Sequence, residues 1–237
     1  MNRNDPISQS FLWHQVPVVG AVLATFTDDQ SIADVDFRSC LSMNEKEQAA
    51  ALSDPLEHRH FIARRCFQRL FVSQHIGFTG APRELALLHQ RDTQPKCTDA
   101  PELHLSFSSS GTTAIACASR GGAAGIDIER WRVVKNVAAL AKRYFTPDEA
   151  EALAALPASE QNLAFLHYWT AKEAGLKAVG RGIVFGLNTF TLKRSNKART
   201  HEIFGPENGS KGWSLRHLEF VPEYVIALVA VNSVGIN

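Results

Sequence analysis

The chain has 237 residues, of which 45% are hydrophobic, a share that is ordinary for globular proteins and excludes a disordered chain. Its formal net charge of +1 provides no overall field towards nucleic acid or a membrane, and no apolar stretch is long enough to span a bilayer, so we expect neither as a partner. The four cysteines are widely spaced without a C-x-x-C pair, and no secretory leader is visible, which together indicate a reducing, cytoplasmic environment.

The first half of the chain is predicted to combine several strands with one long helix. Residues 16–26 are rich in Val, Leu and Ala and predict a buried strand. A capping box at Ser42 opens a short helix to about Leu52, and Asp54-Pro55 opens a longer helix that ends at Gly77. Further strands are predicted at 85–88, 103–107 and 112–119, with a polar loop at 91–101. The turn at 120–122 predicts a hairpin, and we place the boundary there between two halves, residues 1–122 and 123–237.

The second half begins with a strand and continues with helical periodicity. Three helices are predicted, at 137–144, 146–156 and 159–180, and the third carries Ser159 as its N-cap and Gly180 as its C′ glycine. Strands are predicted at 190–194, 213–218 and 224–231. This mixture of strands and helices is compatible with an α+β fold.

The predicted strand at 125–129 carries two acidic side chains on one face. Because side chains alternate along a strand, Asp127 and Glu129 point the same way and lie about 6.6 Å apart along the strand. Two carboxylates that close raise each other's pKa unless a cation lies between them. The ordinary alternative is a solvated acidic face.

The third predicted helix adds a carboxylate and an ammonium group. Trp169, Glu173 and Lys177 follow one another at intervals of one helical turn, so they share one face. An ordinary ion pair between Glu173 and Lys177 is the simpler interpretation of this helix alone. Taken with the acidic strand, the three carboxylates and the lysine predict a site for Mg²⁺ and phosphate.

These two stretches together resemble the motifs of the Sfp-type 4′-phosphopantetheinyl transferase superfamily. The G-[IV]-D-x-E motif is matched at 125–129 and the W-x-x-K-E-x-x-x-K motif at 169–177, in the family's order and at its separation. Residues 141–146, AKRYFT, resemble the family's A-K-R-[FY]-F-[ST] segment, with Glu149 at its usual place. The resemblance implies two similar α/β halves in a pseudo-twofold arrangement, with the active site in the cleft between them.

The resemblance also implies an activity. Members move 4′-phosphopantetheine from coenzyme A to a serine of an apo acyl, polyketide or peptidyl carrier protein and release adenosine 3′,5′-bisphosphate. Asp127, Glu129 and Glu173 match the metal ligands for Mg²⁺, Glu173 and Lys177 the catalytic residues, and Lys172 and Lys177 the lysines near the phosphates. We expect a cytoplasmic monomer that binds coenzyme A as substrate.

The residues expected to bind coenzyme A depart from the family pattern. The family's S-H-S turn is Ser108-Ser109-Ser110 here, so serine hydroxyls replace an imidazole, and the G-[KR]-P motif is Thr93-Gln94-Pro95, with Lys96 as the nearest cation. On the long helix, His60 falls where an arginine is common, and Arg65 and Arg69 match a G-R-x-x-x-R pattern, which predicts coenzyme contacts. The simpler interpretation of that helix is a solvated basic stripe.

The carboxylates match the family motifs, whereas the residues expected to bind coenzyme A depart from them. Two classes of function are compatible with this combination. The first is an active transferase that holds coenzyme A differently, and the second is a non-catalytic relative that binds a carrier protein or nucleotide without turnover. A general Mg²⁺-dependent phosphatase or nucleotidyl transferase does not explain the W-x-x-K-E spacing. We favour the active transferase, because it uses all three carboxylates and both lysines.

Overall fold

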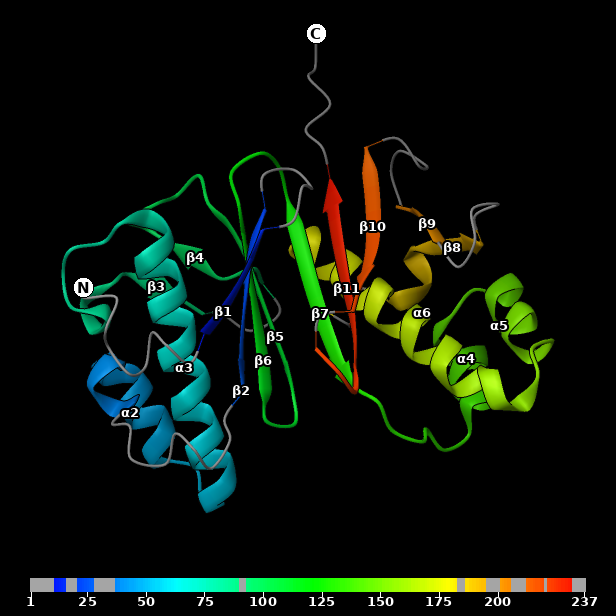
Figure 1. The fold of residues 1–237 in the computed structure, drawn as a ribbon, viewed down its shortest axis with the longest axis horizontal. Coiled ribbons are helices and arrows are strands. Elements are labelled where there is room, and N and C mark those ends of the chain that lie inside the picture. The colour runs from blue at the N-terminus through cyan, green and yellow to red at the C-terminus, as the bar shows by residue number, and fades with distance from the viewer. Residues whose placement is uncertain are drawn as a thin grey trace, which may run out of the picture.

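A computed structural model describes residues 11–15, 21–27, 37–89, 93–182, 186–194, 201–205, 212–219 and 221–231. Within these ranges the fold is mixed α and β, with two main sheets side by side and helices on the outer face of each (Figure 1). No helix in the described ranges is both long and apolar enough to cross a membrane.

The first sheet belongs to the N-terminal part of the chain. It is antiparallel, in the order β1-β2-β6-β5, and its strands are β1 (Phe11–Gln15), β2 (Val22–Thr27), β5 (His104–Ser110) and β6 (Thr113–Ser119). Helix α3 (Pro55–Ile76) packs on its outer face, and α2 (Met43–Ala50) lies beside α3 (Figure 1). The alternation of β6 explains this packing, since Ala114, Ala116 and Ala118 join the core under α3 while Ile115 and Cys117 face the other way.

The helices of this half form as their caps predict. The capping box between Ser42 and Glu45 is present, and Asp54 accepts hydrogen bonds from the first turn of α3. Gly77 ends α3 in the left-handed conformation, with φ of 68°, which glycine adopts without a Cβ penalty. A 3₁₀ turn precedes α2 and another follows α3, at Phe37–Cys40 and Pro82–Glu84.

The second sheet belongs to the C-terminal part. It is antiparallel, in the order β10-β11-β7, and consists of β7 (Ala124–Arg130), β10 (Trp213–Leu218) and β11 (Tyr224–Val231). Helix α6 (Ala158–Ala178) covers its outer face, with α4 (Val137–Tyr144) and α5 (Pro147–Ala154) packed beyond it (Figure 1). A short pair, β8 (Thr191–Arg194) and β9 (His201–Phe204), follows the 3₁₀ turn at Leu187–Thr189.

A third apolar cluster lies between the two sheets. It joins Leu23 and Ile115 of the first sheet to Ile126, Ile128 and Leu228 of the second. The inner faces of both sheets are therefore buried, and Ile126 and Ile128 point into this cluster while Asp127 lies on the opposite face, under α6. The alternation predicted for the acidic strand is confirmed.

Several predictions of strand pairing and extent were wrong. The turn at 120–122 does not form a hairpin, because β6 pairs with β2 and β5, whereas β7 pairs with β11 in the other sheet. The chain changes sheets at this turn, and the proposed division at residue 122 and the twofold relation of the halves stay predictions.

The other differences concern short elements at the edges of the fold. Strand β1 was not predicted, and residues 16–20 of the strand predicted at 16–26 lie outside the described ranges. A two-residue strand β4 (Lys96–Cys97) pairs with β3 (Leu87–Leu88) inside the region predicted as loop, and β9 was not predicted. Helix α6 begins after Pro157 rather than at a Ser159 cap.

Gly125 sets the distance between β7 and α6. A Cβ at this position would lie 2.0 Å from the carbonyl oxygen of Ala174 and 2.4 Å from the amide nitrogen of Ala178, so no larger residue fits. The helix backbone therefore rests directly on the strand. This contact brings Glu173 and Lys177 over the face of β7 that carries Asp127.

Candidate active site

Asp127 lies at the centre of a buried polar cluster between β5, β7 and α6. Its side chain is almost fully buried, and its Oδ1 accepts hydrogen bonds from Ser108 Oγ at 2.6 Å and from Lys177 Nζ at 2.6 Å. Lys177 Nζ also donates to Ser108 Oγ at 2.9 Å. Asp127 Oδ2 is buried and has no hydrogen-bond partner among the described residues, which leaves one carboxylate oxygen to accept a further ligand.

Glu129 continues the same face of β7 towards solvent. Its Oε2 accepts a hydrogen bond from Ser110 Oγ at 3.1 Å and lies 3.8 Å from the guanidinium of Arg132. Partial burial and the nearby charge of Asp127 raise the pKa of Glu129. The strand therefore presents two carboxylates that repel each other.

Alternate serines of β5 connect the two sheets at this point. Ser106 Oγ accepts a hydrogen bond from the amide of Ile126 at 3.0 Å, and Ser110 Oγ accepts one from the amide of Arg130 at 2.9 Å. With Ser108 they form a row that faces β7, as expected for residues two apart on a strand. No role was predicted for Ser106 from the sequence, although its spacing of two from Ser108, opposite the acidic strand, was a usable signal.

Glu173 completes the group of carboxylates from α6. Burial, and then the charge of Asp127, raise its pKa to about 7, while Lys177 acts in the opposite direction. Trp169, one turn earlier, donates a hydrogen bond to this carboxylate and stacks on Phe165 at 5.7 Å between ring centroids. Trp169 therefore orients Glu173 as well as anchoring α6 in its core.

The donor set fits a hard divalent cation such as Mg²⁺. The charge of Asp127 raises the pKa of Glu129 and of Glu173, and among the described residues one buried oxygen of Asp127 has no hydrogen-bond partner. A cation placed among the three carboxylates would therefore offset a charge that Lys177 only partly offsets. Across the described ranges, however, no three side chains of His, Cys, Asp or Glu are already close enough to hold a metal ion. A shared cation therefore requires side-chain rotation.

The raised pKa of Glu173 predicts an unusual dependence of stability on pH in metal-free buffer. The folded protein holds this proton more tightly than the unfolded chain, so the free energy of unfolding falls as pH rises from 4.5 to about 7. We expect Glu173→Gln to remove about 1–3 kcal/mol of that fall and to stabilise the protein at pH 8.

Urea unfolding at pH 5 and pH 8 with a chelator present measures this difference. Adding Mg²⁺ at pH 8 should stabilise the wild type more than Glu173→Gln. An equal decline of stability with pH in both proteins would contradict the assigned pKa.

Comparison with known proteins agrees with the two sequence motifs. Residues 123–229, which include Asp127, Glu129 and Glu173, match the model of the 4′-phosphopantetheinyl transferase superfamily. The 4′-phosphopantetheinyl transferase HetI of Nostoc sp. is 31% identical over 204 residues, which cover 84% of this chain and 82% of HetI. The chain belongs to the 4′-phosphopantetheinyl transferase superfamily.

Other relatives are similar over smaller parts of the chain. The 4′-phosphopantetheinyl transferase Sfp of Bacillus subtilis is 30% identical over 139 residues, which cover 59% of this chain and 60% of Sfp. A crystal structure of a holo-(acyl-carrier-protein) synthase from Bacillus anthracis in complex with CoA (3′,5′-ADP) aligns at a TM-score of 0.38 and 22% identity, over 47% of this chain and 96% of that one. The match to HetI and to the family model confirms the family resemblance seen in the sequence.

Lys172, which the family motif places near the phosphates, does not lie in the site. Its side chain is fully buried, and its ammonium pairs with Glu149 at 2.7 Å and donates to the carbonyl oxygens of Leu187 at 3.1 Å and Phe190 at 2.5 Å. Glu149 in turn accepts from the amide of Leu192 at 2.7 Å. Because all these partners are structural, the predicted phosphate contact of Lys172 is corrected to a role in holding α5, α6 and β8 together.

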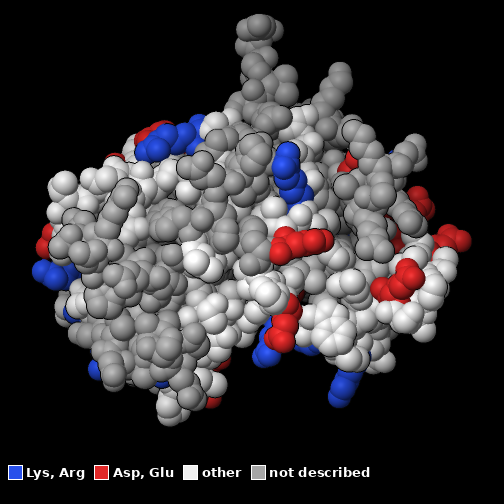
Figure 2. Space-filling view, in the orientation of Figure 1, with Lys and Arg blue, Asp and Glu red and all other residues white. Residues whose placement is uncertain are grey.

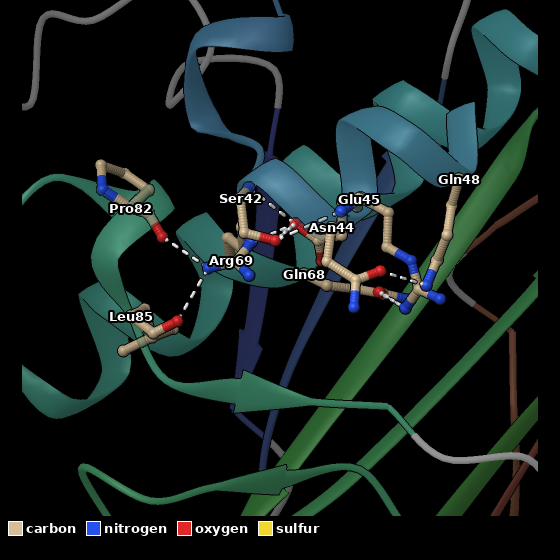
Figure 3. Close-up of polar contacts among 9 residues, drawn as sticks. Ser42, Asn44, Glu45, Gln48, Gln68, Arg69, Pro82 and Leu85 are labelled. Carbon is tan, nitrogen blue, oxygen red and sulfur yellow. Dashed lines mark hydrogen bonds and ion pairs between the residues drawn. The ribbon is translucent and has the colours of Figure 1, made fainter. Parts of the chain in front are cut away.

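Arg69 is likewise removed from the expected coenzyme contacts (Figure 3). Its guanidinium is buried, lies 2.5 Å from the carboxylate of Glu45, and donates to the carbonyl oxygens of Pro82 and Leu85, each at 2.9 Å. Glu45 is the capping-box residue of α2, so Arg69 ties α3 to both flanking segments. The position in the G-R-x-x-x-R pattern is matched, but the side chain points into the core.

The remaining cations predicted on α3 have different surroundings. Arg65 donates to the side-chain oxygen of Gln68 at 3.0 Å and lies over the ring of Phe61, 5.2 Å from its centroid. His60 lines a small hollow together with Arg64 and the turn at 111–113. Neither residue reaches Asp127 or Lys177 in the contacts above, so their predicted coenzyme contacts stay a proposal.

A pocket of about 310 Å³ reaches Lys177, the residue that contacts Asp127. Lys177 and Arg181 of the C-terminal part line it, together with Thr93, Gln94 and Pro95 from the altered G-[KR]-P motif. Gln94 stands at the position where the family's G-[KR]-P motif has a cation. Its Nε2 donates to the carbonyl oxygen of Lys177 at 2.9 Å, so it caps a carbonyl group in the last turn of α6. On the face shown in Figure 2, described side chains of both charge signs are dispersed among neutral ones.

Proposed function

We propose that this chain transfers the 4′-phosphopantetheine group of coenzyme A to a serine hydroxyl of an apo carrier protein, with Mg²⁺ bound by Asp127, Glu129 and Glu173. The observation that carries the proposal is the cluster of these carboxylates around Lys177, beside a pocket, inside the stretch that matches the transferase family. Bound there, Mg²⁺ would offset the negative charge of the coenzyme pyrophosphate.

The side chains supply the other parts of the reaction. Lys177 already lies against Asp127 and Ser108 and lines the pocket, so its ammonium can offset charge on a phosphate oxygen there. The serine oxygen of the carrier forms a bond to the phosphorus next to the pantetheine arm, and the bond from that phosphorus to the bridging oxygen breaks. Adenosine 3′,5′-bisphosphate leaves with that oxygen.

Glu173 is the group suited to take the proton of the attacking serine. In the metal-free protein, burial and then the charge of Asp127 raise the pKa of Glu173 to about 7, and Mg²⁺ bound at this carboxylate would lower it and keep the carboxylate ionised, in the form that accepts a proton. Trp169 holds the carboxylate in place from the previous turn. Asp127 is less suited to accept this proton, because its Oδ1 already accepts hydrogen bonds from Ser108 and Lys177.

The experiment is a mass measurement on apo carrier proteins. Fatty-acid, polyketide and peptide-synthetase carriers are incubated separately with the protein, coenzyme A and Mg²⁺, and a serine-to-alanine form of each carrier is the matched control. A mass gain of one phosphopantetheine group on at least one carrier, absent from its control, is the expected result. Carrier binding without any mass gain would instead support the non-catalytic relative, and would overturn the transferase proposal.

A further inference from the structure

Two serines of β5 lie opposite the two acidic residues of β7, at the same spacing of two. Ser108 Oγ donates a hydrogen bond to Asp127 Oδ1 at 2.6 Å, and Ser110 Oγ donates one to Glu129 Oε2 at 3.1 Å. Because side chains two apart on a strand share a face, the spacing of the serines repeats the spacing of the carboxylates. Each carboxylate of the strand therefore receives a hydrogen bond from its own serine.

The serine between them faces the other way. Ser109 Oγ accepts a hydrogen bond from the guanidinium of Arg64 on α3 at 3.3 Å, as expected for the neighbour of two residues that face β7. The coenzyme contact expected of Ser109 stays a prediction. The pairing of serine with carboxylate is therefore a property of one face of β5.

The direction of both hydrogen bonds is fixed by a second partner on each hydroxyl. Ser108 Oγ accepts from the ammonium of Lys177 at 2.9 Å, and Ser110 Oγ accepts from the backbone amide of Arg130 at 2.9 Å. An ammonium group and an amide N–H can only donate, so the proton of each serine is left for the carboxylate. Both hydroxyls are therefore oriented as donors towards β7.

Each serine engages one oxygen of its carboxylate. Ser108 and Lys177 both contact Oδ1 of Asp127, and within the described residues the buried Oδ2 has no hydrogen-bond partner. Ser110 contacts Oε2 of Glu129 in the same way. A carboxylate that is held through one oxygen rotates less freely, and its other oxygen can bind a cation.

We propose that Ser108 and Ser110 are positioning residues of the metal site, each of which holds one oxygen of its carboxylate and leaves the other for the shared Mg²⁺. The inference rests on the proposed function, which assigns the metal to Asp127, Glu129 and Glu173. Hydrogen bonds from residues outside the ligand set typically change metal affinity or activity by about 10- to 100-fold. The affinity of the site for Mg²⁺ is then set partly by β5, which contributes no ligand.

The simpler interpretation is that the serines only connect the two sheets. Strands β5 and β7 belong to different sheets, and Ser106, the preceding serine of the row, accepts a hydrogen bond from the amide of Ile126 at 3.0 Å. This contact joins the strands through a backbone group rather than a carboxylate. Ser106→Ala therefore removes a hydroxyl from the same row and is the matched control.

Titration with Mn²⁺ tests the assignment without relying on turnover. Mn²⁺ stands in for Mg²⁺, and the electron paramagnetic resonance signal of the free ion shows how much is bound. With coenzyme A present, Ser110→Ala should bind Mn²⁺ about 10- to 100-fold more weakly than the wild type. Ser108→Ala should weaken binding at least as much, because its hydroxyl contacts both Asp127 and Lys177.

Two further variants separate positioning from a general loss of packing. Ser110→Thr keeps the hydroxyl, so its Mn²⁺ affinity should return to within about threefold of the wild type. Ser106→Ala should lower the urea midpoint of unfolding, as Ser110→Ala does, but should leave the Mn²⁺ affinity within about threefold. At Mg²⁺ concentrations that saturate each protein, calorimetry should give the same coenzyme A affinity for Ser110→Ala and the wild type.

Each other outcome overturns a defined part of the account. An unchanged Mn²⁺ affinity in either alanine variant would remove that serine from the positioning role, and equal weakening in Ser106→Ala would make the whole row structural. A loss of coenzyme A affinity that persists at saturating Mg²⁺ would make Ser110 a coenzyme contact instead. In these cases transfer by the wild type would still support the proposed function. A wild type that binds no Mn²⁺ overturns the inference, and if it also modifies no carrier, the proposed function is overturned with it.

Discussion

Asp127→Asn is expected to lower the rate of phosphopantetheine transfer at saturating Mg²⁺ by at least about 100-fold, which corresponds to about 3 kcal/mol of transition-state stabilisation. The physical reason is that the two oxygens of this carboxylate have different roles. Its Oδ1 positions Ser108 and Lys177, and its buried Oδ2 has no hydrogen-bond partner within the described part of the chain. The amide keeps the shape of the side chain but supplies no charge for Mg²⁺.

The measurement is the initial rate of carrier modification, with a urea unfolding curve to show that the variant is folded. Asp148→Asn is the matched control, because it removes one exposed carboxylate from the first turn of α5 and should leave the rate unchanged. Transfer by Asp127→Asn within about threefold of the wild type would remove Asp127 from the metal site.

The second large effect concerns stability. Lys172→Met should lower the free energy of unfolding by about 3–5 kcal/mol, because it leaves the buried carboxylate of Glu149 without its partner. At a temperature where the variant is still folded, its affinity for coenzyme A should stay within about threefold of the wild type. This separation distinguishes a structural lysine from one that contacts phosphate.

Urea unfolding and calorimetry on the same preparations measure both quantities. Lys142→Met, on the exposed surface of α4, is the control for removing a lysine charge. Adding Glu149→Gln to Lys172→Met should recover part of the stability, because the amide oxygen can still accept from the Thr146 or Leu192 amide without burying a charge. If Lys172→Met left the stability unchanged and greatly weakened coenzyme A binding, Lys172 would contact the phosphates after all, and the structural assignment would be wrong.

Local signals in the sequence predicted most helices and the acidic strand. The capping box at Ser42, the proline after Asp54 and the glycine at Gly77 act within a few residues of the helix ends they define. The alternation of Asp127 and Glu129 with isoleucine is equally local, and the structure confirms which face each side chain takes. Patterns of this kind need no knowledge of distant parts of the chain.

Pairings between distant residues could not be predicted in the same way. The hairpin expected at 120–122 was wrong because β7 finds its partner in β11, about a hundred residues later. Lys172 and Glu173 are adjacent in the motif, yet a rotation of about 100° between neighbours on a helix sends one into the core and the other towards Asp127. Lys172 is a structural residue because the fold places Glu149 beside it, whereas Lys177 lies beside Asp127.

The most direct test of the metal-centred site is a crystal structure of the protein with coenzyme A and Mn²⁺, which is located by its anomalous scattering and stands in for Mg²⁺. The account predicts one anomalous peak with carboxylate oxygens of Asp127, Glu129 and Glu173 among its ligands, at close to the distances of about 2.0–2.1 Å that Mg²⁺ requires, and with the pyrophosphate beside Lys177. A peak that lacks Asp127 and Glu173 as ligands, or coenzyme A bound with its pyrophosphate away from Lys177, would contradict it.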